Sequence, residues 1–222
     1  MKSKMIILAA LMAAATPAVA QDASGTTGSV SVGVTGGTLG IGPEVGFRFS
    51  EMFGVRGNLT FLSISQDAES DGVDYDGKLK LASGGLMLDV HPFGGGFRVS
   101  GGARINGNKV RLRATPTEDV EIGDEVYTPE EIGVLTGNVK AKSFAPTLTL
   151  GYFGGAARGL NFGIEAGGMF QGSPRVRDLK TTGLLASDPD FQAELAREAE
   201  ELEDEVDYKI FPIVQVSLGY RF

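Results

Sequence analysis

The sequence contains no cysteine and a single histidine among its 222 residues. Without cysteine, the chain can form neither a disulfide nor a lipid-anchored N-terminus. It also lacks an apolar run of about 20 residues, the length that a membrane-spanning helix requires. Cationic residues are in the minority, with 20 Lys and Arg against 28 Asp and Glu, and no basic stretch is present. The composition therefore makes nucleic-acid binding a poor expectation.

The N-terminus has the pattern of an export signal. Lys2 and Lys4 precede an uninterrupted apolar run of eleven residues, Met5 to Ala15, and Ala18-Val19-Ala20 has the small-x-small form of a cleavage site. We therefore expect residues 1–20 to be a cleaved signal peptide and residues 21–222 to be the mature protein. Removing two of the 20 basic residues leaves 18 against 28 acidic ones, a net charge of −10. That charge by itself predicts repulsion from anionic lipopolysaccharide unless cations intervene.

The last fifteen residues alternate in character. Since successive side chains of a strand point to opposite faces, one face is continuously apolar and the other is mostly polar or small. The apolar face carries aromatic residues towards both ends, as a lipid-facing strand would. It consists of Tyr208, Ile210, Pro212, Val214, Val216, Leu218, Tyr220 and Phe222.

Alternation and turn signals divide the mature chain into eight strands. We place them at about 29–35, 39–49, 53–65, 78–91, 97–112, 140–153, 160–177 and 208–222. Three short turns (50–52, 92–96 and 154–159) interleave with three long loops (67–76, 114–139 and 178–206). The prediction is an all-β protein, an eight-stranded antiparallel up-and-down transmembrane β-barrel, with the short turns and both termini on the periplasmic side. The alternative is a soluble lipocalin-like or sandwich domain, which would turn its apolar faces inward.

The polar faces of these strands favour the barrel, because they carry charges of both signs that suit a small lumen. We expect a lumenal polar network of nine residues: Glu44, Arg48, Arg56, Asp89, His91, Arg98, Arg104, Glu165 and Arg221. Five arginines against three carboxylates predict a mildly basic lumen. Eight strands leave an interior just wide enough for side chains to fill, so we expect it to be largely blocked. A narrow anion-preferring pathway is the alternative.

Three stretches resemble a known class of protein. His91-Pro92-Phe93-Gly94-Gly95-Gly96-Phe97-Arg98, Phe170-Gln171-Gly172-Ser173-Pro174 and the terminal Tyr220-Arg221-Phe222 are similar to strand ends and turns of small Gram-negative outer-membrane β-barrels. That class contains the outer membrane protein A transmembrane domain and the outer membrane protein W group. The resemblance implies a location in the cell outer membrane. It also implies that Tyr220 and Phe222 form the terminal signal that the barrel-assembly machinery recognises. It brings no catalytic residue.

Two features could carry chemistry, and each has a plainer interpretation. Barrel hydrolases use histidine, but no Gly-x-Ser-x-Gly elbow accompanies His91, so a lumenal or interfacial histidine is the better interpretation. The five acidic residues within Asp67 to Asp76 could bind Ca²⁺. Their spacing does not follow the EF-hand pattern, and a solvated loop is the preferred interpretation. We predict no catalytic residue, no cofactor and no metal site.

The last long loop is expected to contain an acidic helix over 188–206. Asp188 can cap it and Pro189 suits its first position. Phe191, Leu195, Ala199, Leu202 and Val206 recur at helical spacing, and ten acidic side chains lie between Asp188 and Asp207. The helix is either a lid packed on the loops or a gate and interaction surface over the barrel mouth. Residues 127–132, with Thr128 as cap and Pro129 at the first position, could be its partner.

These patterns favour a non-enzymatic outer-membrane barrel with a plugged polar lumen and a structural or loop-mediated role. The alternative is a narrow channel or transporter for small solutes or apolar molecules. An outer-membrane hydrolase would require an essential role for His91. The expected partners are the outer-membrane bilayer and, during assembly, the barrel-assembly machinery. The partner of the external loops stays open.

Overall fold

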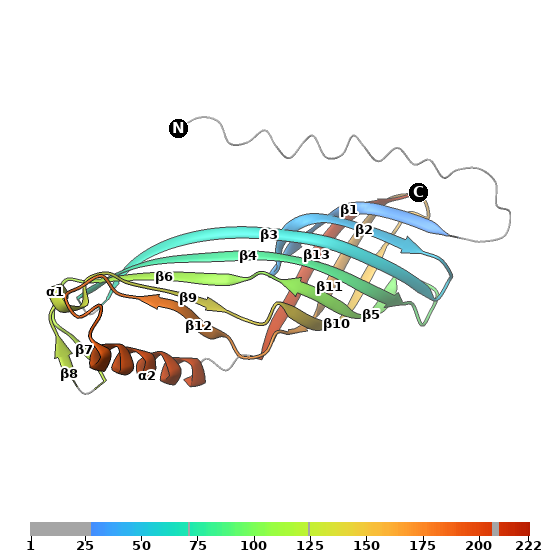
Figure 1. Cartoon of the computed structure of the whole chain (residues 1–222). Coiled ribbons are helices and arrows are strands. Elements are labelled where there is room, and N and C mark those ends of the chain that lie inside the picture. Colours follow the sequence, from blue (N-terminus) through green and yellow to red (C-terminus); the bar gives the residue numbers. More distant parts are fainter. Residues whose placement is uncertain (1–27, 71, 124, 206–208) are drawn as a thin grey trace, which may run out of the picture.

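Eight antiparallel strands form a ring in the computed structural model of the chain, which describes residues 28–70, 72–123, 125–205 and 209–222 (Figure 1). The predicted signal peptide lies outside these residues. The ring order is β1, β2, β3, β4, β5, β10, β11, β13 and back to β1. Their bounds are β1 Ser29–Gly37, β2 Gly40–Arg48, β3 Phe53–Ser70, β4 Val73–Val90, β5 Phe97–Asn106, β10 Phe144–Gly155, β11 Gly159–Phe170 and β13 Ile210–Arg221. The predicted all-β, eight-stranded antiparallel architecture is confirmed.

The first and last strands of the chain close the ring. β1 pairs with β13 over seven positions, from Ser31 opposite Arg221 to Gly37 opposite Gln215. β1 also pairs with β2 through a tight reversal at Thr38 and Leu39, where Gly40 adopts a φ of 97° that a residue without Cβ tolerates best. Each strand of the ring is hydrogen-bonded on both sides.

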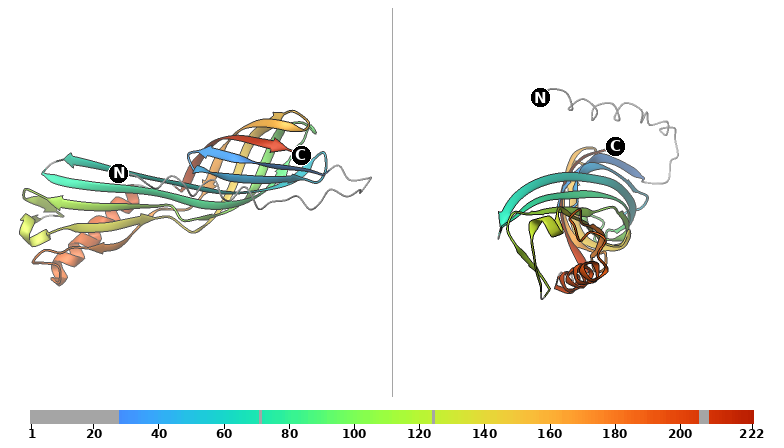
Figure 2. Two further views of the ribbon diagram at one scale, coloured as in Figure 1. Left: turned by 90° about the horizontal axis from the view of Figure 1, so that it is seen from above. Right: turned by 60° about the vertical axis from the view of Figure 1, so that its left-hand side comes forward.

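An arm of sheet extends from one end of the ring, away from the C-terminus (Figures 1 and 2). β3 and β4 run 18 residues each and continue into it. Beside them lie β6 (Lys109–Pro116), β9 (Leu135–Lys140) and β12 (Arg175–Lys180). β5 and β6 both pair with β4, and β9 pairs with β6 just as β10 pairs with β5. The arm is therefore the continuation of five of the eight ring strands, whereas β1, β2 and β13 end at the rim.

The arm corrects the predicted loops. The segment 67–76 is not a loop, because β3 and β4 pair as far as Ser70 opposite Val73. The predicted strand 97–112 runs on to Pro116 with a break at 107–108, and the strand 140–153 begins at Leu135 with a break at 141–143. The strand 160–177 breaks at 171–174 and ends at Lys180. Dense charge at 67–76 predicted a loop, but the alternation and pairing of β3 and β4 continue through that segment.

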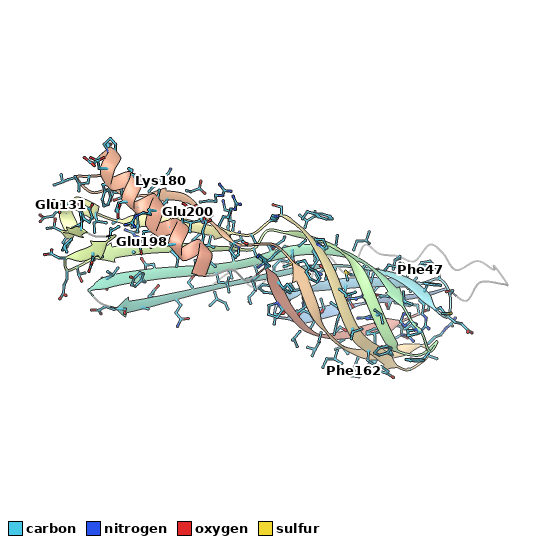
Figure 3. All side chains as sticks on the ribbon, turned by 90° about the horizontal axis from the view of Figure 1, so that it is seen from below. Phe47, Glu131, Phe162, Lys180, Glu198 and Glu200 are labelled. Carbon is cyan, nitrogen blue, oxygen red and sulfur yellow. The ribbon has the colours of Figure 1, made fainter. Side chains whose placement is uncertain are left out.

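The outer surface of the ring is apolar and the inner surface is mostly polar. On β13, the predicted apolar face points outward from Ile210 to Phe222, while Gln215 is buried inside. Phe47 on β2 and Phe162 on β11 also project away from the ring (Figure 3). A soluble sandwich would place such side chains between its sheets, so the observed arrangement is not that of a sandwich.

A small apolar core closes the far end of the arm. It joins the hairpin β7 (Val120–Ile122) and β8 (Glu125–Tyr127) to the helices α1 (Pro129–Ile132) and α2 (Pro189–Glu205). The Phe191 ring meets that of Tyr127 edge to face, with centroids 4.9 Å apart. Ile122, Ile132 and Leu195 complete the cluster.

The ends of both helices follow the sequence prediction. The Asp188 carboxylate accepts hydrogen bonds from the backbone N–H groups of Asp190 and Phe191, so it caps α2 as predicted. In α1, the Glu131 carboxylate accepts the Thr128 backbone N–H at 2.8 Å. This bond lowers the pKa of Glu131. The predicted packing of the acidic helix on residues 127–132 is present, and Val206 lies outside the described residues.

Candidate functional site

Arg56 of β3 lies at the centre of the ring interior and contacts three carboxylates from three other strands. Its guanidinium is 3.0 Å from Glu44 on β2, 3.2 Å from Asp89 on β4 and 2.6 Å from Glu165 on β11. Only 4% of the Arg56 surface is exposed. The planar fork of donors in arginine lets one side chain satisfy acceptors on several walls at once. The pairing therefore ties opposite sides of the ring together.

Arg98 of β5 completes this group. Its Nη2 lies 3.0 Å from Glu165, and its Nη1 lies 3.9 Å from Asp89. The Ser100 hydroxyl donates to Asp89 at 2.6 Å. We call Glu44, Arg56, Asp89, Arg98 and Glu165 the ion cluster. A buried charge is costly unless it is paired and hydrogen-bonded, and each member of the ion cluster has an opposite charge within 3.2 Å.

Arg104 is also buried, at 3% exposure, but it stands apart from the ion cluster. Its guanidinium donates to the Ser83 hydroxyl at 3.0 Å and to Thr60 at 3.4 Å. Within the described residues, no carboxylate forms an ion pair with it. It is thus a desolvated cation held by neutral hydroxyl groups.

The other three predicted lumen residues lie at the rim near the C-terminus. The Arg48 guanidinium donates to backbone carbonyls of the neighbouring turns, including Gly94 at 2.7 Å. The His91 Nδ1 lies 3.1 Å from the carbonyl of Phe97. Arg221 stacks over the Phe153 ring at 5.6 Å, as Arg98 does. With Arg48 and Arg221 at the rim, the enclosed charges are three arginines and three carboxylates, so the interior is balanced rather than basic.

An apolar layer that the sequence did not predict lies at the arm end of the interior. Leu39, Ala145, Met169 and Ile213 pack together there, each at most 2% exposed. Ala145, Met169 and Ile213 lie on inward strand faces, and Leu39 lies in the β1–β2 turn. The alternation contains this signal, since Ile213 shares its face with Gln215. The ion cluster, Arg104 and the apolar layer are thus all buried inside the ring.

No catalytic constellation is recognisable among the residues that the structure describes. His91 contacts a backbone carbonyl and lies at the rim. Among the described residues, no three His, Asp or Glu side chains converge to hold a metal ion. Neither helix in the described ranges has the length and apolar character needed to cross a membrane. Tyr220 and Phe222 lie exposed on the outer surface, with ring centroids 4.9 Å apart.

Comparisons with known proteins bear on the fold. No protein-family model and no curated protein matches the sequence. Among solved structures, the crystal structure of Acinetobacter baumannii CarO2 aligns with a TM-score of 0.61 and 19% identity, over 87% of this chain and 98% of that chain. The crystal structure of A. baumannii CarO aligns with a TM-score of 0.55 and 18% identity, over 87% and 97%. At these identities the likeness concerns the fold, and it confirms the expected resemblance to small outer-membrane-type β-barrels.

Proposed function

We propose that this chain is an integral outer-membrane β-barrel whose lumen is closed by its own side chains, and whose work is done by the external arm rather than by catalysis. The observation that carries the proposal is the inversion of the usual soluble pattern. Large apolar side chains cover the outside of the ring, and paired charges fill the inside. A hydrocarbon environment stabilises the apolar side chains on the outside. The charges on the inside must be paired because the interior is dry.

The direction of the barrel follows from its connections. The short turns β2–β3, β4–β5 and β10–β11 lie at the end that also holds the chain terminus at Phe222. In bacterial barrels the short turns are periplasmic and the long segments are external. The arm with α1 and α2 would then stand outside the cell. The fold shared with CarO and the signal pattern of residues 1–20 support the same location.

The closed lumen supports a structural or interaction role over transport. Eight strands leave room for little more than side chains. Here the ion cluster spans the interior, and the apolar layer lies above it at the arm end. A narrow pathway for small solutes would require these groups to separate. Tyr220 and Phe222 would serve the assembly machinery as the terminal signal.

Single-channel recording tests the closed lumen. The mature protein would be refolded into a planar bilayer beside a variant lacking residues 188–205, and the mobility shift between unheated and boiled gel samples would verify folding of both. We expect both proteins to be silent. Steady conductance from the wild type would refute the closed lumen and establish the channel alternative. Conductance from the deletion alone would make α2 a gate.

A further inference from the structure

The outer face of the arm carries nine cations in register across four strands. The row nearest the ring reads Lys80, Lys109, Lys140 and Arg175 on β4, β6, β9 and β12. The next row reads Lys78, Arg111, Asn138 and Arg177, and the third reads Asp76, Arg113, Thr136 and Lys180. Directly paired residues of antiparallel strands share a face. We call these nine Lys and Arg residues the basic face.

The basic face has far fewer negative partners than positive charges. Within the described part of the chain, one ion pair reaches it, between Lys140 Nζ and Asp178 at 3.3 Å. Like charges directly opposite on neighbouring strands destabilise a sheet, and three cations in succession, Lys80, Lys109 and Lys140, stand in that relation. Arg111, together with Lys80 and Lys140, lowers the pKa of Lys109. Such an arrangement is stabilised when anions occupy it.

The body of α2 does not cover the basic face. α2 packs on the opposite face of the arm, where Leu135 and Leu179 lie against the cluster of Phe191 and Leu195. At the edge of the sheet, the Glu203 carboxylate of α2 accepts the Val176 backbone N–H of β12 at 2.6 Å. Asp76 of the third row and the neighbouring outer carboxylates of β3 and β4 lie farther from the ring. The row nearest the ring therefore consists of cations alone.

The basic face begins where the apolar surface of the ring ends. On β4, the outward positions Leu88, Leu86, Gly84 and Ala82 lead directly to Lys80 and Lys78. The same transition occurs on the neighbouring strands, beyond exposed Ile105, Phe144 and Phe170. At about 3.3 Å per residue, Lys80 lies roughly 7 Å along the strand from Ala82. Cations at this height would meet the headgroup region of the outer leaflet.

A depression in the basic face is a candidate binding pocket for an anion. It has a volume of about 310 Å³ and opens between a wall of Lys78, Arg111, Arg113 and Asp76 and a wall that includes Asn138 and Asp178. A register shift between Arg177 and Lys180 brings the Asp178 carboxylate to this side, where it accepts from Asn138 at 3.2 Å. Its cation-rich wall suits a phosphate group.

We propose that the basic face binds the phosphorylated sugar headgroup of outer-leaflet lipopolysaccharide. The inference rests on the proposed function, because it needs the arm to stand on the external side of a membrane-inserted ring. It reverses the repulsion expected from net charge, because the surface that lies against the leaflet is cationic. Phosphate groups would neutralise the first two rows, and the acyl chains would continue along the apolar surface below.

The test uses mature wild-type protein in phosphatidylcholine vesicles containing bisphosphorylated lipid A, with dephosphorylated lipid A as the lipid control. The variants are Lys80→Gln and the triple variant Lys80→Gln, Lys109→Gln and Arg111→Gln. Arg158→Gln is the matched control, since Arg158 is exposed in the β10–β11 turn at the opposite end of the ring. Each juxtamembrane cation contributes enough that we expect about fivefold weaker lipid A binding for Lys80→Gln and about a hundredfold for the triple variant. Arg158→Gln and wild type should bind equally.

Folding and insertion are scored separately, by vesicle flotation and by gel mobility. In phosphatidylcholine alone, the triple variant should be at least as thermally stable as wild type, because its like-charge rows are gone. A wild type that fails to insert would refute the proposed function. Insertion without preference for phosphorylated lipid, or a triple variant that binds like wild type, would overturn the basic-face assignment alone. If free inorganic phosphate bound as tightly as phosphorylated lipid A, the lipid would be rejected as the specific ligand. A third outcome is that the protein binds no lipid A but self-associates with rising concentration, and that the triple variant abolishes this association. The basic face would then bind the acidic α2 of a second copy and not lipopolysaccharide.

Discussion

Replacing Arg56 with methionine should be among the most destabilising single changes in the ring, whereas the same replacement at Arg104 should be nearly neutral. Both side chains are at least 96% buried in the same interior. Arg56 pairs with three carboxylates, and Arg104 with hydroxyl groups only. The two substitutions remove the same atoms and the same charge, so their difference isolates the pairing.

The magnitudes follow from what each change leaves behind. Without Arg56, Asp89 and Glu165 still have Arg98, but Glu44 retains only the amide of Asn58 at 3.2 Å. Removing one partner of a buried ion pair costs about 3–5 kcal/mol, or about 10²- to 4 × 10³-fold in the folding equilibrium. Without Arg104, no carboxylate loses a partner, and the Thr60 and Ser83 hydroxyls, 3.1 Å apart, can bond each other. Relief of arginine desolvation offsets the lost bonds, so we expect a change within about 1 kcal/mol.

The assay is equilibrium unfolding in vesicles with urea, read from the folded fraction on unheated gels because the chain has no tryptophan. Lowering the pH should reduce the cost of Arg56→Met, because protonated carboxyl groups no longer need a cation. Equal midpoints for Arg56→Met and wild type, or equal losses for the two variants, would refute the idea that pairing stabilises the interior.

Three further changes test other parts of the molecule. Leu218→Arg places a charge on the outer face of β13, where Leu218 is 49% exposed, and should cost about 2–4 kcal/mol near the bilayer midplane; an unchanged folding yield in vesicles would contradict the assignment of that face. Phe191→Ala removes the centre of the apolar core at the far end of the arm and should destabilise that core by about 3–5 kcal/mol. Limited proteolysis should then cut α2 while the gel shift of the ring persists. Loss of the gel shift together with cleavage of α2 would show that the arm and ring fold as one unit. Asp178→Asn removes the carboxylate beside Lys140, and lipid A binding should tighten about fivefold. Lys140 lowers the pKa of Asp178, so the wild-type ion pair holds above the ordinary pKa of aspartate and is lost as pH falls through the lowered value; the gain from Asp178→Asn should vanish in the same acid range.

The ring was predictable because its physical signal is local. Alternation of apolar and polar residues assigns each strand and its faces, as on β13 from Ile210 to Arg221. The inward direction of Arg56, Asp89 and Glu165 follows from the same rule. Their mutual contacts do not, because they depend on the stagger of strands around the ring, which brings Arg56 of β3 to Glu165, 109 positions later. No local pattern specifies that stagger.

The arm was missed for a different reason. Between residues 67 and 76, the described charged residues Asp67, Glu69, Asp74 and Asp76 occupy the outer positions of β3 and β4, and Val73 and Tyr75 hold alternate positions of β4. In a membrane strand one face is apolar because it meets lipid, so a charged outer face in the sequence predicts a loop. The same alternation with a polar outer face describes a strand that continues beyond the apolar outer surface of the ring. How far a strand extends beyond the ring is decided by its pairing in the assembled sheet, so the local sequence does not specify it.

The unequal height of the strands makes the mouth of the ring one-sided. Where β1 meets β2 the wall ends at Gly37 and Gly40, and β13 begins at Ile210 on the same low stretch of rim. Next to this stretch, β3 and β4 carry the wall onward to Ser70 and Val73. The mouth of the ring is therefore accessible over the low rim at β1, β2 and β13 and screened on the side of the arm. A neighbour docked at β1 and β13 would cover this accessible side.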